Sequence, residues 1–173
     1  ALNDREKMEQ FEQRRQELNT LPAIDYEAVN EAKWEYFRLI FDQEGEAVLQ
    51  SPDYLDFFRA NREWLQPYAA FCYLRDAYGT PDFRSWPHYA EYNQQEIDAL
   101  CAPGTPDYPK IAIYYYIQYQ LHRQLIAATR HARANGVVLK GDIPIGISRN
   151  SVEAWKEPHY FNLNGQAGAP PDD

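Results

Sequence analysis

Residues 110–147 read KIAIYYYIQYQLHRQLIAATRHARANGVVLKGDIPIGI, and this segment contains the strongest structural signal in the chain. Its first part, 110–135, has the composition of a long helix, and the apolar residues on every side of its first turns are typical of a helix buried on several faces. Gly136 ends this helix, because glycine is common just past a helix C-terminus. The apolar run over 137–147 has the pattern of a buried parallel strand. Helix, glycine and strand together predict the αβ unit of a barrel or of a doubly wound sheet.

Residues 1–62 are predicted to form a helical scaffold region. Strong helix formers with a sparse apolar stripe over 3–19 indicate a mostly solvated helix. Asp25 is placed to cap a second helix with a much heavier apolar face, and we expect Gly45 to interrupt that helix. A third helix is predicted over 53–61.

Residues 63–173 form the second predicted region, a helical lead-in followed by the long helix, the strand and a polar loop. A helix over 63–78 should end at Gly79. Aromatic residues without periodicity over 82–92 indicate an irregular loop, and a short helix should follow over 93–101. The predicted fold class is therefore mainly α: a helical subdomain plus a partial β/α unit with one to three short strands.

The charge balance and the spacing of metal-binding residue types exclude several function classes. Seventeen basic against 26 acidic residues give a net charge of -9, which disfavours nucleic acid and other polyanionic partners and favours a neutral ligand. The four histidines lack metal-ligand spacing, and the phosphate-binding and nucleophile motifs are missing, so no metal and no cofactor is predicted.

Two cysteines and the hydropathy pattern bear on location. Cys72 and Cys101 have neither the spacing of a zinc site nor that of a disulfide framework, so we expect buried free thiols in a reducing cytoplasm. No run of 18 apolar residues appears, and no charged-then-apolar leader opens the sequence, so neither a membrane span nor a signal peptide is predicted.

The polar segment after the predicted strand is the candidate binding site, because sites in αβ folds lie at the carboxyl ends of strands. A guanidinium, an amide, a hydroxyl and an indole gather there: Arg149, Asn150, Ser151 and Trp155. Planar hydrogen-bonding groups beside an aromatic face suit the hydroxyls of a sugar. The alternative is local: Asn150 or Ser151 caps a short helix that ends before Pro158.

Asp142 is a carboxylate inside the predicted apolar strand. Burying a carboxylate is costly unless it is paired or hydrogen-bonded, so its position is informative. It is predicted either to anchor nearby backbone amides or an arginine, or to take part in ligand binding or catalysis.

The string LKGDIPIGISRNSVEAW, residues 139–155, resembles the barrel strand and following loop of the 4-alpha-glucanotransferases, the amylomaltase family known as glycoside hydrolase family 77. Three further segments, in the same order along the chain, are similar to parts of that family: WLQPYAAF at 64–71, YYIQYQLH at 115–122 and GAPPD at 168–172.

This resemblance implies that the chain is an internal fragment of a larger TIM-barrel enzyme, since a complete barrel needs about 250 residues. The implied activity is the retaining transfer of α-1,4-linked glucosyl or maltosyl units between glucans, with α-1,4-glucans or maltose as ligands. Asp142, Arg149, Asn150, Ser151 and Trp155 are then expected to bind substrate. The family's aspartate nucleophile, glutamate acid-base and second aspartate lie downstream of 168–172, so no catalytic residue is assigned and the isolated polypeptide is expected to be inactive.

The first 56 residues resemble the extra helical region of the subgroup that contains the plant cytosolic disproportionating enzyme and related bacterial proteins. Many amylomaltases have aspartate where Asn150 stands, so the resemblance supports sugar-hydroxyl binding there rather than a charged role. The remainder of the parent barrel is the expected partner, with self-association of the fragment through the 110–135 helix as a second possibility. The rival hypothesis is a non-catalytic carbohydrate-binding or protein-interaction module.

Overall fold

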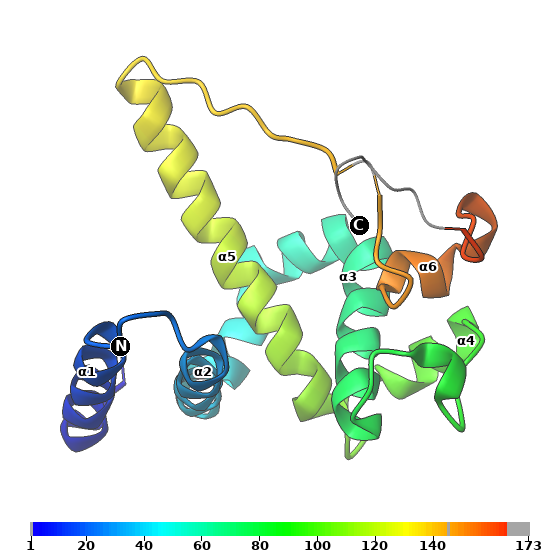
Figure 1. Ribbon diagram of the computed structural model, residues 1–173, viewed down its shortest axis with the longest axis horizontal. Helices are drawn as coiled ribbons and strands as arrows, with labels where there is room; N and C mark the ends of the chain where they lie inside the picture. Colours follow the sequence, from blue (N-terminus) through cyan, green and yellow to red (C-terminus); the bar gives the residue numbers. More distant parts are fainter. Residues whose placement is uncertain (1, 145, 166–173) are drawn as a thin grey trace. The chain divides into compact units, whose positions relative to one another are not determined.

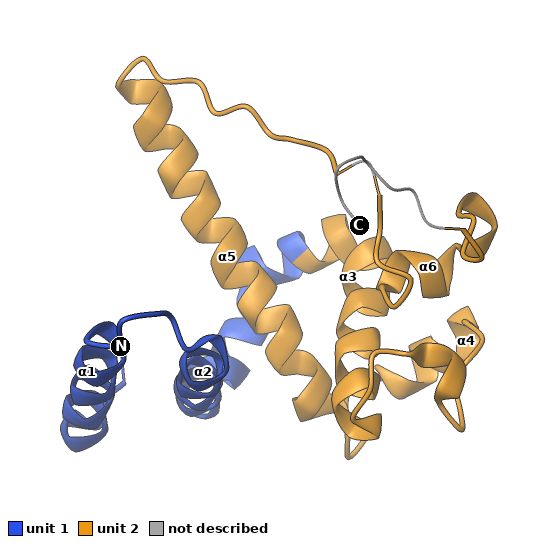
Figure 2. Cartoon of the chain, viewed as in Figure 1, with its two compact units in different colours: residues 1–57 blue, residues 58–173 orange. Residues whose placement is uncertain are grey.

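The computed structural model describes residues 2–144 and 146–165, and it divides the chain into two compact units, residues 1–57 and 58–173 (Figures 1 and 2). The segment 168–172, which was compared with a proline-rich family loop, lies outside the described residues. The boundary between the units falls inside one helix, α3, which spans Pro52–Tyr78.

The first unit consists of an antiparallel pair of helices, α1 (Arg5–Asn19) and α2 (Tyr26–Leu49), and the first turns of α3. Asp4 and Asp25 cap the two helices, because their carboxylates accept hydrogen bonds from the amides of Lys7 and Ala28. The rings of Phe11 and Tyr36 meet edge to face with their centroids 5.1 Å apart. No described residue of α1 is buried, as expected for the solvated helix that the sequence predicted.

Gly45 does not interrupt α2, so that prediction was wrong. It is the one buried residue among those of α2. A Cβ atom at this position would lie 2.5 Å from the ring of Phe41, one turn earlier, so the glycine gives that ring room against the helix. An interior glycine costs a helix only about 1 kcal/mol, too little to end one that is held by tertiary packing.

The second unit packs the rest of α3 against α5 (Tyr108–Ala134), with α4 (Gln94–Leu100) and α6 (Val152–Lys156) beside them (Figure 1). Two single turns of 3₁₀ helix, η1 (Phe83–Ser85) and η2 (Pro158–Tyr160), complete it. The core is formed by residues that are at most 2% exposed on these elements: Leu65, Pro67, Ala69, Ala70, Leu74, Ile97, Ile111, Ala112, Tyr115, Ala154 and Trp155. The first turns of α5 are buried on several sides, as predicted.

Helix α3 is continuous where the sequence predicted two helices, 53–61 and 63–78. Pro67 lies inside it and has no amide hydrogen to donate, so the carbonyl of Glu63, one turn earlier, loses its helical partner. The ammonium group of Lys156 in α6 donates to that carbonyl at 3.5 Å. The long helix thus tolerates its proline partly because another element satisfies the freed carbonyl.

The predicted strand at 137–147 is not formed, and the predicted partial β/α unit is therefore wrong. The structure assigns no strand among residues 2–144 and 146–165, and Ile145 of this segment lies outside them. The segment is extended and its apolar side chains are exposed, with Val138 85% and Ile143 87% accessible. A strand is stabilised by hydrogen bonds to a neighbouring strand, and the described part of the chain supplies no such neighbour.

This correction makes a prediction for hydrogen exchange. The backbone amides of 138–142 should exchange about as fast as those of an unstructured peptide, whereas the amides of 111–116 in the buried turns of α5 should be protected. Exchange followed by mass spectrometry at peptide resolution measures both segments in one sample. Protection over 138–142 equal to that over 111–116 would contradict the unpaired structure.

Candidate functional site

The loop at 148–151 is shaped by two local hydrogen bonds between side chains and the backbone. The hydroxyl of Ser148 accepts from the amide of Asn150 at 3.2 Å. The hydroxyl of Ser151 accepts from the amide of Ala154 at 3.3 Å, which makes Ser151 the N-cap of α6. The capping function predicted as the alternative for Ser151 is confirmed, and any contact of its hydroxyl with a sugar stays a prediction.

Trp155 lies in the core of the second unit rather than on its surface. Trp155 is only 2% exposed, and its indole N–H donates to the backbone carbonyl of Tyr89 at 2.8 Å. The rings of Phe71, Trp86 and Tyr92 surround it, with centroids 5.7, 5.8 and 5.0 Å away. The buried indole therefore anchors α6, the helix that follows the loop at 148–151. Stacking of a sugar on this indole stays a prediction.

The carbonyl that receives the indole N–H comes from a strained residue. Tyr89 has a φ of 65°, and no other non-glycine residue in the described part of the chain has a positive φ. A bulky residue adopts this left-handed conformation only when its surroundings hold it there, at a cost of about 1–3 kcal/mol. In this case the hydrogen bond from Trp155 and the packing around it fix the turn.

The segment before Tyr89 is held by its own hydrogen bonds. The indole of Trp86 donates to the carbonyl of Thr80 at 2.9 Å, and the hydroxyl of Ser85 donates to the carbonyl of Asp82 at 2.7 Å. We name residues 80–92 the aromatic loop. The sequence predicted residues 82–92 of this loop as irregular and gave no sign that the loop contacts the candidate site.

Arg84 links the aromatic loop to the loop at 148–151. Its Nε donates to the carboxylate of Asp82 at 2.8 Å, and its Nη2 donates to Oδ1 of Asn150 at 3.4 Å. Arg149 extends in another direction and donates from Nη2 to the carbonyl of Gly165 at 3.1 Å. Both arginines and Asn150 therefore have defined positions on the exposed or half-buried surface.

Asp142 is not brought into this group. It is exposed, and its carboxylate accepts from the amide of the next residue, Ile143, at 2.9 Å. The expectation of a buried carboxylate is wrong because the strand that would have buried it is not formed. The carboxylate of Asp142 thus anchors the backbone amide of its neighbour Ile143. A contact between Asp142 and a ligand stays a prediction.

Burial controls the ionisation of the tyrosines under the loop. It raises the pKa of Tyr92 to about 12, with the carboxylate of Asp98 as a smaller cause. It also raises the pKa of Tyr89, assisted by the neighbouring Tyr78. The neutral hydroxyl of Tyr92 donates to the side-chain carbonyl of Gln94 at 2.6 Å. These phenols stay protonated at neutral pH and act as packing and hydrogen-bonding groups.

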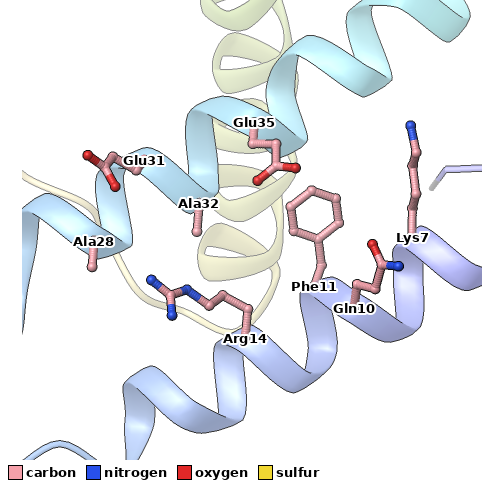
Figure 3. Close-up of a pocket in the computed structure, with 8 residues that line it drawn as sticks. All are labelled: Lys7, Gln10, Phe11, Arg14, Ala28, Glu31, Ala32 and Glu35. Atoms are coloured by element: carbon pink, nitrogen blue, oxygen red, sulfur yellow. The ribbon is translucent and has the colours of Figure 1, made fainter.

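The first unit has grooves of a different kind. One, of about 300 Å³, lies between α1 and α2 and is lined by both positive and negative side chains, including Lys7, Arg14, Glu31 and Glu35 (Figure 3). None of the residues predicted to bind substrate lies there. In the described part of the chain no group of histidine, cysteine and acidic residues could hold a metal, and no helix is long and apolar enough to cross a membrane.

Comparison with protein families matches residues 2–173 to the family described as 4-alpha-glucanotransferase. A rice protein (Oryza sativa subsp. japonica) named 4-alpha-glucanotransferase DPE2 is 44% identical over 149 residues, which cover 86% of this chain and 16% of the rice protein. The 4-alpha-glucanotransferase of Chlamydia muridarum is 30% identical over 161 residues, covering 92% of this chain and 30% of the relative. That of Thermus thermophilus is 30% identical over 159 residues, covering 86% and 31%.

The chain belongs to the 4-alpha-glucanotransferase family, as the motif over 139–155 indicated. It spans between 16% and 31% of the length of these three relatives. No solved structure matches the chain.

Proposed function

We propose that this chain is part of a retaining 4-alpha-glucanotransferase that transfers α-1,4-linked glucosyl or maltosyl units between glucans. Family membership over residues 2–173 supports this function. In the complete enzyme the helices of this chain serve as scaffold, and the bond-breaking carboxylates come from elsewhere in the protein. A cytoplasmic location fits the two buried free thiols, Cys72 and Cys101.

The single observation that carries the binding role is the fixed position of polar side chains on the loop at 148–151. Arg149 and Asn150 are held by hydrogen bonds at 3.1 and 3.4 Å, while Ser151 caps the helix that carries the buried Trp155. Preorganised guanidinium and amide groups suit the neutral, hydroxyl-rich surface of a glucan. Arg149 and Asn150 are the residues we propose to contact sugar, with Ser151 and Trp155 fixing the loop and Asp142 at its edge.

Two substitutions test this binding role. In the full-length protein, Arg149→Ala and Asn150→Ala should each raise the KM for maltose by about fivefold, the effect of one lost hydrogen bond of about 1 kcal/mol. The transfer reaction is followed as glucose released from maltose with glycogen present as acceptor. The same variants should weaken maltotriose binding to the 173-residue chain, measured by calorimetry.

Arg130→Ala provides the matched control, since Arg130 is an exposed arginine on α5 outside this loop. It should leave both KM and maltotriose binding unchanged. Unchanged values for Arg149→Ala and Asn150→Ala would remove the loop from the proposed site. Glucose release that is missing from the wild-type protein would sink the proposed activity itself.

The second candidate function is protein interaction, and the exposed apolar segment at 137–144 favours it. Large side chains rarely stay as accessible as Val138 and Ile143 on a protein that has no partner there. The partner would be the remainder of the enzyme or a second copy of the fragment. Sedimentation of the 173-residue chain over a range of concentrations separates these two, because only self-association depends on the concentration of the fragment alone.

A further inference from the structure

Two loops that are 66 residues apart in the sequence are joined at two points. The guanidinium of Arg84 donates to the amide oxygen of Asn150, and the indole of Trp155 donates to the carbonyl of Tyr89. The first bond lies at the surface and the second in the core. The aromatic loop therefore fixes both ends of the segment that carries Asn150.

The bond from Arg84 decides which atoms of the Asn150 amide remain for a ligand. An asparagine side chain has one carbonyl oxygen, which accepts, and one NH₂ group, which donates twice. The Asn150 oxygen, Oδ1, faces Arg84. Within the described part of the chain no hydrogen bond uses Nδ2 of Asn150, so no described residue occupies its two donors.

Arg84 is itself held in the orientation that this contact needs. Its Nε is bound to Asp82 at 2.8 Å, and its guanidinium carbon lies 6.0 Å from the centroid of the Phe83 ring. A guanidinium is a rigid planar fork, so fixing Nε also fixes the direction of Nη2. A lysine at this position has one ammonium group and cannot reproduce both bonds in that geometry.

We propose that Arg84 is a positioning residue that turns the Asn150 amide, so that this part of the site offers N–H donors to a hydroxyl or ring oxygen of the glucan. This inference rests on the proposed function, and it assigns Arg84 no contact with the ligand. Specificity at this subsite then follows from donors alone. Asparagine is suited to the task because its oxygen and its nitrogen can serve two different partners at once.

The test is a double-mutant cycle in the full-length protein. Arg84→Ala and Asn150→Ala should each raise the KM for maltose about fivefold with kcat changed less than about twofold, and the double variant should be no worse than Asn150→Ala. Arg84→Lys should recover only part of the loss. Asn150→Asp, which keeps the bond to Arg84 but has no N–H donor, should bind maltose as poorly as Asn150→Ala.

A second readout uses the 173-residue chain labelled with nitrogen-15. Maltotriose should shift the side-chain NH₂ resonances of Asn150, and Arg84→Ala should weaken that shift without lowering the melting temperature. Arg130→Ala is again the control, and it should change neither quantity.

Four results would overturn the inference. If the KM increase in the double variant equals the product of the two single-variant increases, Arg84 acts independently of Asn150. Wild-type KM in Asn150→Asp would mean that the ligand uses the oxygen. Wild-type KM in Arg84→Ala, while Asn150→Ala and Arg149→Ala both raise KM, would remove the positioning role and leave the proposed function standing. Wild-type KM in all three single variants would remove both the positioning role and the proposed binding role of the loop.

Discussion

Replacing Trp155 with alanine should lower the free energy of unfolding by about 3–5 kcal/mol, the range measured for removing a large aromatic side chain from a core. The indole is 2% exposed and lies among the rings of Phe71, Trp86 and Tyr92, so its loss leaves a cavity under the loop. The carbonyl of Tyr89 also loses its donor. Since domains are stable by only about 5–15 kcal/mol, this change removes a large part of the free energy of unfolding. Urea unfolding followed by circular dichroism measures the change.

Trp64 supplies the matched control, because it is another tryptophan but is 46% exposed. Trp64→Ala should cost only about 1 kcal/mol. Trp155→Phe should fall between the two, since it keeps an aromatic ring and loses the hydrogen bond to Tyr89. Equal losses for Trp155→Ala and Trp64→Ala would show that Trp155 does not organise the core.

Raising the pH from about 10 to about 12 should progressively destabilise the protein, because half-buried tyrosines must then ionise. Burial is the largest cause that raises the pKa of Tyr68, Tyr73 and Tyr92 from 10.0 to about 12. The folded state holds these protons more tightly than the unfolded state does. Its stability is therefore complete below pH 10 and is lost as the pH rises through 12. Urea midpoints and tyrosinate absorbance, recorded at each pH, measure the loss and its cause.

Tyr68→Phe should reduce the alkaline loss, since phenylalanine has no proton to release. Tyr26→Phe is the control, because Tyr26 is 76% exposed and its replacement should leave the pH profile unchanged. An unfolding free energy that stays constant up to pH 12 would contradict the raised pKa values of these half-buried tyrosines.

The ends of several helices could be predicted from single residues. Asp25 caps α2, while Gly79 and Gly136 follow α3 and α5 with φ values of 69° and 73°. Capping and left-handed termination are local events that depend on a few neighbouring residues. The interior of α3 was not predictable in the same way, because the carbonyl freed by Pro67 is satisfied by Lys156, far along the chain.

The prediction of a strand at 137–147 was wrong because a strand depends on a neighbouring segment and not on local residues alone. The apolar pattern of 137–147 is real, but the same pattern suits any extended segment that is covered by a partner, and the pattern says nothing about whether the partner is present. Asp142 shared that error, since its predicted burial depended on the strand. In the structure both are exposed.

The sequence by itself determined the family, through the motif over 139–155, and the positions where several helices begin or end. Only the tertiary structure decided that Trp155 is a core residue, that Tyr89 receives its indole hydrogen bond and that Arg84 contacts Asn150. The physical reason is the range of the interactions. Helical hydrogen bonds join residues four apart and are visible in a short window, whereas the contacts that shape the candidate site join residues 66 apart and exist only after the chain has folded.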